Sequence, residues 1–552
     1  MARALSERLT ITGTLQAKTP LHIGGLPDST EVDMPLARNG QGELYVPGTS
    51  LAGIFRAWME RHFNNVTALD EFFGSQQPIQ KNKHKPKGAA SRLLIEDAKV
   101  TLPADLPEEL WDSVSIDRRW GTVADGKKFD RTVLPKGSRL DFCLQVDLPK
   151  DIELANTMRA MLGYLMKALQ AGQVALGAAS TRGLGQVELI SPQLLEVDWS
   201  QKDSLLSWLG DELEAKKLDC KTLIEAIPTL VCRRPSILHI TIDWTPVGPL
   251  MVKASHDGIA VDTLPMISGV DDKKIALVLP GSSLKGALRG QAERIVRTVL
   301  GHTQLSKEWL KQVQVPLIDY VFGAAKKAYK KKELKDSKDA RPSVPGRGCI
   351  SVYTCYAKNA QCTTEQWQQI ETAKPLVGNK NHLYDAFKSA KFRQSPYFEQ
   401  GYHLAVDRWT GGAAEGFLYS AIEPFEVEWE PIHLTLDLGK EEKEDSDRLP
   451  SELKAPALAL LLLLLRDLSE QRLPIGFGVN RGYGVLAVKK VTFQWEEMSE
   501  IDNKHWLDGV SLENPFSLNN LSGQEIKKLQ SDWQVWINAQ KKSKTLSAEA
   551  LT

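Results

Sequence analysis

The 552-residue sequence predicts an α+β protein made of two tandem copies of one unit. A repeated phrase is the first observation behind this prediction. YVPGTSLAGIFRAWME at position 45 returns at position 278 as VLPGSSLKGALRGQAE, with seven identities in register, which chance does not explain. Length is the second observation, because a chain this long exceeds one ordinary hydrophobic core.

Further segments recur in the same order around this phrase. The matched pairs are LQAKTPLHIGG (15–25) and IDWTPVGPLMVKAS (242–255); STEVDMPLA (29–37) and GIAVDTLPM (258–266); LDEFFGS (69–75) and IDYVFGA (318–324); VSIDRRWGTVADGKKF (114–129) and LAVDRWTGGAAEGFLY (404–419); STRGLGQVEL (180–189) and VNRGYGVLAV (479–488). The offset grows from 229 residues at Asp33/Asp262 to 299 at Arg182/Arg481. The second copy therefore has longer insertions, which loops tolerate.

This alignment predicts four regions. They are a first unit at 1–196, a helical connector at 197–236, a second unit at 237–495 and a C-terminal extension at 496–552. Within each unit, an alternating strand (LTITGTLQA; ILHITIDW) precedes the helix after the Pro-Gly phrase. Two strand-like segments, an apolar helix and a strand after a glycine loop follow. The order predicts a ferredoxin-like (RRM-like) βαββαβ core with inserted loops, a fold whose open sheet face commonly meets single-stranded RNA.

Composition excludes several classes of protein. The 42% hydrophobic and 25% charged fractions are typical of a soluble globular chain. Six cysteines without a CxxC pair favour reduced thiols in the cytoplasm over a zinc site or disulfide framework. The run APALALLLLLLRDL is too short to span a bilayer and predicts a buried helix, so no membrane partner is expected. No Walker motif, dinucleotide fingerprint or nucleophile elbow is present.

Charge is balanced overall but unevenly distributed. The net charge is zero, whereas the loops at 80–92 and 326–347 are rich in Lys and Arg, and 441–447 is acidic. Either basic loop alone could equally be an ordinary solvated loop or a phosphate-binding one. Two at equivalent places favour contact with a phosphate backbone.

The repeated Pro-Gly turns supply candidate RNA-binding residues. Pro-Gly makes a tight turn, and the following Ser or Thr is expected to cap a helix whose N-terminal amides bind phosphate. The candidates are Thr49, Ser50, Ser282 and Ser283, with Arg56, Lys285 and Arg289 adding charge further along the helix. The alternative is an ordinary capped helix that packs on its sheet, which does not explain the repeated arginine.

The glycine loops that close each unit are a second set of candidates. They comprise Arg182, Gly183 and Gly185 in the first unit and Arg481, Gly482 and Gly484 in the second. Glycine lets backbone approach a ligand closely, and arginine suits phosphate or a stacked base. A β-turn with a solvated arginine is the alternative.

The motif order resembles the RAMP superfamily. LHIGG, xVDxP, PG[ST]SLxGxxR, an FxG phrase, an xDR segment and a terminal RGxG loop together look like backbone subunits of type III CRISPR effector complexes. Two such subunits would be fused in one chain, as is most typical of type III-D. The resemblance covers about 15–190 and 240–490. It implies RAMP units with loop and thumb insertions, and partners comprising CRISPR guide RNA, complementary target RNA and other effector subunits.

The resemblance also implies an activity. In target-cleaving members, an aspartate in the loop after the first strand cuts target RNA in a metal-dependent step, and its positions match Asp33 and Asp262. A divalent cation, Mg²⁺ or Mn²⁺, would activate the nucleophile and neutralise the phosphate; its further ligands are unknown from sequence. The thumb hairpins would include Trp120 and Trp409 beside the xDR phrases.

Three alternatives stay open. Each aspartate alone could form an Asx-turn or a helix N-cap. The whole chain could be a non-catalytic scaffold that binds guide RNA. A guide-precursor-processing enzyme using histidine is disfavoured, because His22 and His256 are not at matched positions and no histidine pair recurs in both units.

Overall fold

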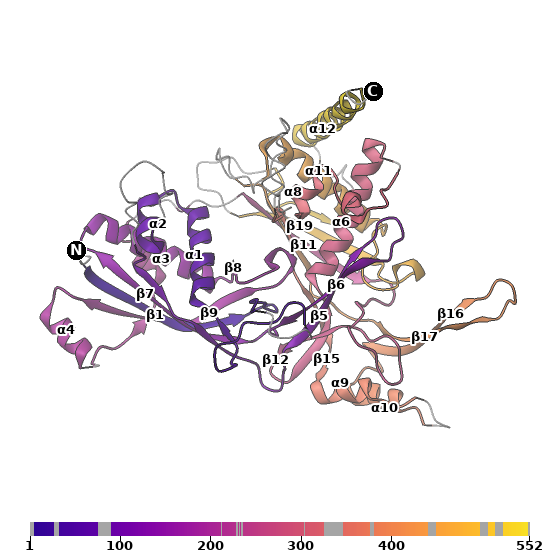
Figure 1. The fold of residues 1–552 in the computed structure, drawn as a ribbon, viewed down its shortest axis with the longest axis horizontal. Coiled ribbons are helices and arrows are strands. Elements are labelled where there is room, and N and C mark those ends of the chain that lie inside the picture. Colours follow the sequence, from indigo (N-terminus) through magenta and orange to yellow (C-terminus); the bar gives the residue numbers. More distant parts are fainter. Residues whose placement is uncertain are drawn as a thin grey trace.

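The computed structural model describes most of the chain, and structural statements below refer to the described residues. They are 5–26, 32–75, 90–210, 212–227, 230, 232, 236–302, 304–324, 346–375, 380–439, 449–496, 506–513, 521 and 523–549. The acidic segment at 441–447 and nearly all of the basic loops at 80–92 and 326–347 lie outside them. Figure 1 shows two bodies of sheet and helix, with the N-terminal unit in indigo to magenta.

The first unit is an antiparallel sheet with helices on one face. Its order is β10-β9-β1-β7-β4-β2, with β3 on β7 and β8 on β9. The bounds are β1 Leu5–Ala17, β2 Tyr45–Val46, β3 Leu93–Ile95, β4 Ala98–Thr101, β7 Arg139–Pro149, β8 Val174–Ala175, β9 Gln186–Asp198, β10 Lys216–Lys217, α1 Gly48–His62, α2 Val66–Phe73 and α3 Ile152–Gln170. Alternate β1 residues Leu9, Ile11 and Leu15 are fully buried in one core with Phe55 of α1 and Met158 of α3. The period-2 pattern read from the sequence thus places one face of β1 in the core.

The second unit repeats this plan. Its main sheet has the order β14-β18-β11-β19-β20, antiparallel throughout. The bounds are β11 Ile237–Pro246, β14 Ile350–Val352, β18 Ile432–Asp437, β19 Leu486–Trp495, β20 Ser511–Glu513, α6 Gly281–Leu300, α8 Ile318–Phe322 and α11 Ser451–Ser469. A smaller sheet joins β12 Ile267–Asp271, β13 Lys274–Leu279 and β15 Cys355–Thr363. The predicted α+β class is confirmed, with matching strand pairs in the two units.

The apolar run near 460 forms the middle of α11. Leu460, Leu461, Leu462, Leu464 and Leu465 are all at most 2% exposed. The helix is therefore buried all round for several turns, as the sequence predicts. Among the described helices, none combines the length and apolarity that crossing a membrane requires.

Each unit bears a long β-hairpin at the xDR segment, where thumb insertions are expected. The first joins β5 (Glu109–Ile116) to β6 (Val123–Val133), and the second joins β16 (Tyr397–Val406) to β17 (Ala413–Phe425). The first hairpin lies against the second unit, whereas the second hairpin projects away from the body (Figure 1). Within the described part of the chain, only the first hairpin therefore has its tip packed against another unit.

The connector and the extension pack onto the units beside them. The connector contributes α4 (Lys202–Leu209), β10 on the edge of the first sheet, and α5 (Cys220–Ile224), whose Leu223 joins the first core. The extension contributes β20 on the edge of the second sheet and α12 (Gln524–Glu549), whose Trp536 joins the second core. The insertion at 358–403 contains α9 (Thr364–Glu371) and α10 (His382–Ser389).

Candidate nucleic-acid interface

Asp33 is fastened to the base of the first hairpin by a reciprocal pair of hydrogen bonds. Its backbone N–H donates to Asp130 Oδ1 at 2.7 Å, and the N–H of Asp130 donates to Asp33 Oδ2 at 3.1 Å. The next residues, Met34 and Arg131, form a parallel β-bridge. An exposed loop carboxylate and a hairpin carboxylate thus lie side by side.

Asp262 occupies the matching place in the second unit with a different partner. Its N–H donates to the Ser420 carbonyl at 3.1 Å, and the Ser420 N–H and Oγ donate to Asp262 Oδ2 at 2.8 and 3.1 Å. Thr263 and Ala421 repeat the parallel bridge. In both units the carboxylate accepts from a strand 97 or 158 residues away; among the described residues, neither accepts from the local backbone as an Asx-turn or N-cap would require.

The two sites differ in what they offer a divalent cation. Mg²⁺ and Mn²⁺ prefer oxygen ligands, chiefly carboxylates, phosphates and water. Asp33 and Asp130 provide two carboxylates, whereas Asp262 has a serine beside it that occupies one of its oxygens. Within the described ranges, no group of three or more His, Cys, Asp and Glu side chains is placed to hold a metal. Any cation here would therefore need ligands from RNA and water.

Arg131 follows Asp130 in β6, so its side chain points to the opposite face of that strand. Arg131 is 8% exposed, and its Nε has no hydrogen-bond partner among the described residues. Burial lowers the pKa of its guanidinium. An unpaired donor of a buried cation is costly unless an acceptor reaches it.

The helices after the Pro-Gly turns begin differently from the prediction. The N-cap residues are Pro47 and Pro280, and no side chain caps either helix, so the predicted Ser/Thr capping is wrong. Instead the first amides are satisfied by side chains from the short links between strands: Gly48 N–H donates to Asp97 Oδ1 at 2.7 Å, and Gly281 N–H to Thr354 Oγ1 at 3.3 Å. Proline is favoured at this end of a helix because φ is already set.

The hydroxyl candidates at these helix starts are only partly accessible. Thr49 is exposed, whereas Ser50, Ser282 and Ser283 are half-buried. A glycine precedes them because a Cβ at Gly48 would lie 2.2 Å from the Ile95 carbonyl oxygen. Thr49 is thus the hydroxyl that most directly faces solvent.

The basic candidates on these helices have separate environments. Arg56 is on the surface, paired with Glu60 at 2.7 Å. Arg289 is paired with Glu293 at 2.9 Å and donates to the Gly323 carbonyl at 2.7 Å. Lys285 is 5% exposed and donates to the Ile350 carbonyl at 2.8 Å, and burial lowers its pKa to about 7. An RNA contact by Lys285 would require it to leave this carbonyl.

The glycine loops are used differently in the two units. Gly183 has φ +85° and is buried against the second unit, where a Cβ would lie 2.6 Å from Thr354 N. Its carbonyl accepts from Thr354 Oγ1 at 3.0 Å. Gly482 has φ +86°, and no described atom lies within 4 Å of the position that a Cβ would take there. The Cζ of Arg481 lies 5.2 Å from the Tyr419 ring centroid. The first loop therefore receives protein backbone, and the second is open.

The second glycine of each loop, Gly185 or Gly484, packs closely against a backbone carbonyl of its own unit. A Cβ at Gly185 would lie 2.0 Å from the Leu176 carbonyl oxygen, and one at Gly484 1.8 Å from that of Ile475. Both positions have positive φ, at +86° and +76°, which favours glycine. These two glycines shape the turn itself.

Comparison with known proteins identifies the repeated unit. The family model described as "RAMP superfamily" matches residues 14–188 and 267–487. The chain belongs to the RAMP superfamily. The "CRISPR system Cms endoribonuclease Csm3" of Methanocaldococcus jannaschii is 24% identical over 215 residues, covering 35% of this chain and 82% of that protein. A chain from the "Crystal structure of Csm3-Csm4 subcomplex in the type III-A CRISPR-Cas interference complex" has 17% identity and a TM-score of 0.25, covering 40% of this chain and 95% of that one.

The two RAMP units meet through side chains that sequence reasoning missed. Glu109, at the start of the first hairpin, accepts hydrogen bonds from Gly269 N at 2.7 Å, Ser268 Oγ at 3.1 Å and Trp111 Nε1 at 2.9 Å. Burial raises its pKa to about 7. Glu399 lies at the matched place of the second hairpin, eight residues before the turn aspartate, so local sequence does not set Glu109 apart.

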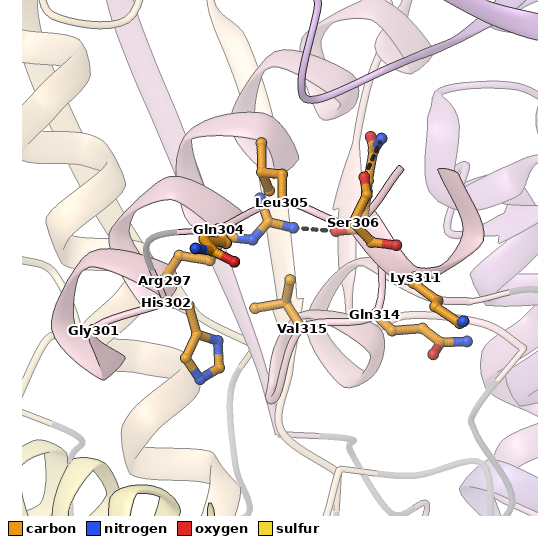
Figure 2. Close-up of a pocket in the computed structure, with 10 residues that line it drawn as sticks. Arg297, Gly301, His302, Gln304, Leu305, Ser306, Lys311, Gln314 and Val315 are labelled. Atoms are coloured by element: carbon orange, nitrogen blue, oxygen red, sulfur yellow. Dashed lines mark hydrogen bonds between the residues drawn. The ribbon is translucent and has the colours of Figure 1, made fainter. Parts of the chain in front are cut away.

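A polar cavity of about 400 Å³ lies at the C-terminal end of α6 in the second RAMP unit (Figure 2). Its lining includes Arg297, Lys311 and Gln312 from α6 and α7 (Trp309–Gln312). None of the candidate residues from the sequence lines it. Its place beside the docked tip of the first hairpin links it to the junction between units, through Gln312.

Proposed function

We propose that this chain is a cytoplasmic backbone subunit of a type III CRISPR effector complex that binds guide RNA and cleaves base-paired target RNA. Its two RAMP units and its likeness to a protein named as a Csm3 endoribonuclease support the assignment. The main support for the cleavage step is that Asp33 and Asp262 are hydrogen-bonded to matching strands of the two hairpins. Guide RNA, target RNA and other effector subunits are the partners this function requires.

Each unit is also proposed to be ferredoxin-like. Strands β9-β1-β7 and the short β3 on β7 match β19-β11-β18 and β14 in the second sheet. In both units one helix follows the first strand and another precedes the last, as βαββαβ connectivity requires.

In the cleavage step, a bound Mg²⁺ or Mn²⁺ would supply nucleophile activation and charge neutralisation. In the first unit Asp33 and Asp130 would hold it. In the second unit Asp262 would hold it, with one oxygen kept in place by Ser420. The hairpin fixes each loop carboxylate, so the carboxylate is positioned before RNA arrives.

RNA binding would use the surface left open by the fold. Thr49 and Arg56 on α1 and the Arg481–Gly482 loop are accessible. Arg182 is exposed as well, beside the junction. The half-buried hydroxyls of Ser50, Ser282 and Ser283 are secondary candidates, while Lys285 and Arg289 are held by contacts within the second unit. Cationic and glycine-rich surface of this kind suits a sugar–phosphate backbone without reading sequence.

The test is cleavage of labelled target RNA by the assembled complex with Mg²⁺. Wild type, Asp33→Ala, Asp262→Ala and the double variant are compared, with RNA binding measured on each. Loss of a distinct product in each single variant, with binding retained, is the expected result. Identical products from wild type and the double variant would instead make the chain a guide-binding scaffold.

A further inference from the structure

The loop that carries Asp262 is held on both sides of the aspartate. It spans residues 247–266, between β11 and β12. Directly after Asp262 the loop is joined to β17, because the Ile422 N–H donates to the Thr263 carbonyl at 3.0 Å. Before Asp262 it contacts a different part of the chain, the C-terminal end of α9.

Glu371, the last residue of α9, holds this earlier part of the loop by both side chain and backbone. Its Oε1 accepts a hydrogen bond from His256 Nε2 at 2.9 Å. Its carbonyl accepts the Ile259 N–H, also at 2.9 Å. Gly258 lies between these two contacts, and a Cβ there would be 3.4 Å from the same carbonyl oxygen. Residues 256–259 therefore lie closely against the end of the helix.

Helix α9 is itself fixed in place at both ends. Thr363 and Gln366 form a capping box at its start. Trp367 is 3% exposed and belongs to the second core, and its Nε1 donates to Glu371 Oε1 at 2.6 Å. The carboxylate that meets His256 is therefore oriented by a buried side chain of its own helix.

The stability of α9 alone does not account for a glutamate at this position. The C-terminal end of a helix carries partial negative charge, so a carboxylate there is unfavourable unless a cation or donor compensates it. The side chain of Glu371 is 26% exposed, so packing does not require it either. Its compensation comes from the loop, through His256.

The first unit has no equivalent of this helix. In the second unit residues 364–396 separate β15 from β16 and include α9 and α10. In the first unit the described residues 102–108, which join β4 to β5, form no helix. The two loop aspartates therefore differ in support as well as in hairpin partner, since Asp130 stands beside Asp33 and Ser420 beside Asp262.

We propose that Glu371 is a positioning residue for the Asp262 site and acts through His256 and the Ile259 amide. This inference rests on the proposed function, because it concerns cleavage at Asp262. That aspartate is exposed on an irregular loop, so its distance from an RNA phosphate depends on how firmly the loop is held. Displacing a catalytic group by about 1 Å can slow a reaction about 100-fold.

The experiment measures both cleavage products of one assembled complex, so the Asp33-dependent product is an internal control. Wild type, Asp262→Ala, Glu371→Ala, Glu371→Gln and the control Asp385→Ala, an exposed acid on α10, receive saturating labelled target RNA. Glu371→Ala is expected to slow the Asp262-dependent product at least about ten-fold and to leave the other product unchanged. Glu371→Gln keeps an acceptor oxygen for His256 and should recover most of the rate, and Asp385→Ala should match wild type.

A His256→Ala variant tests whether the two side chains act through one contact. Combined with Glu371→Ala, it should slow the product no further, because residues that share one interaction have non-additive effects. Amide hydrogen exchange supplies a readout besides activity. The Ile259 amide should exchange at least about five-fold faster in Glu371→Ala, because a loop that has lost its side-chain anchor opens more often. Effects that multiply, or an unchanged exchange rate at Ile259, would contradict the inference.

The remaining outcomes separate this inference from the proposed function. Equal loss of both products in Glu371→Ala would give α9 a role in the fold alone and overturn the inference, as would a wild-type rate. If Asp262→Ala changed no product, the proposed function would fail in the second unit and the inference with it. If Asp262→Ala removed its product while Glu371→Ala left that product intact, the inference alone would fail.

Discussion

Asp33 and Asp130 each donate a backbone N–H to the other's carboxylate, although 97 residues separate them in the sequence. The exchange joins the loop after β1 to the hairpin base and leaves free lone pairs on both carboxylates. In the second unit Ser420 replaces the acid and donates where Asp130 accepts. The two RAMP units therefore share a scaffold but differ in negative charge at the site.

Removing the hairpin acid is expected to affect the first unit alone. Asp130→Ala should reduce formation of the Asp33-dependent product roughly 10- to 100-fold, because groups that hold a metal-site carboxylate contribute on that scale. The reduction should be partly relieved at high Mg²⁺ concentration, a response that a purely structural defect would not show. Quantitative cleavage at several Mg²⁺ concentrations measures it.

Ser420→Ala is the matched control for this prediction. It removes one donor to Asp262 and leaves Asp33 untouched, so only the Asp262-dependent product should change. If Asp130→Ala altered both products equally, Asp130 would be supporting the fold and not one site.

Two glycines with nearly equal φ offer a paired test of the junction. Gly482→Ala introduces only backbone strain, which costs about 1 kcal/mol, because nothing lies within 4 Å of its Cβ position. Gly183→Ala adds a collision 2.6 Å from Thr354 N, so its melting temperature should fall further. Equal melting temperatures for the two variants would show that Gly183 does not pack closely on the second unit.

Glu109 should make the junction between units sensitive to pH. Its folded-state pKa of about 7 exceeds the ordinary 4.5, so the folded state binds a proton that the unfolded state has lost. The free energy of unfolding should therefore decrease as pH rises from about 5 to 7. Glu109→Gln should flatten this dependence, as measured by urea denaturation at pH 5, 6, 7 and 8; an unchanged slope would contradict the raised pKa.

Lys285 should produce the opposite trend in a higher window. Its folded-state pKa of about 7 lies below the ordinary 10.5, so the unfolded state binds more protons between these values and stability should rise with pH there. Lys285→Met should remove that rise. It should also retain guide RNA in the purified complex, whereas loss of RNA without loss of stability would restore Lys285 as an RNA contact.

The sequence predicted what depends on repetition and periodicity. The matched strands and helices, the buried α11 and the hairpins at the xDR segments follow from patterns that occur once in each unit and so twice in the chain. The pairing of Asp33 with Asp130 was not predictable, because hydrogen bonds over such separations leave no periodic signal. Capping by Ser or Thr was wrong because Asp97 and Thr354, distant in sequence, satisfy the first helical amides.

The junction residues were missed for a related reason. Glu60 and Glu293 are one of the seven identities in the repeated phrase, yet only the second is buried, by a hairpin from the other unit. Local sequence could not distinguish them. The two glutamates differ only in their surroundings, since Glu60 lies on the surface and Glu293 is buried.

Arg118, at the tip of the first hairpin, donates to both carboxylate oxygens of the buried Glu293 on α6. This contact between the two units takes place within one polypeptide. Tethering sets the effective concentration of such partners at roughly millimolar, whatever the amount of protein present. The contact between these two units therefore does not weaken on dilution, whereas a contact between separate chains would. Covalent linkage thereby fixes the stoichiometry of the pair at one to one in every assembly that contains this protein.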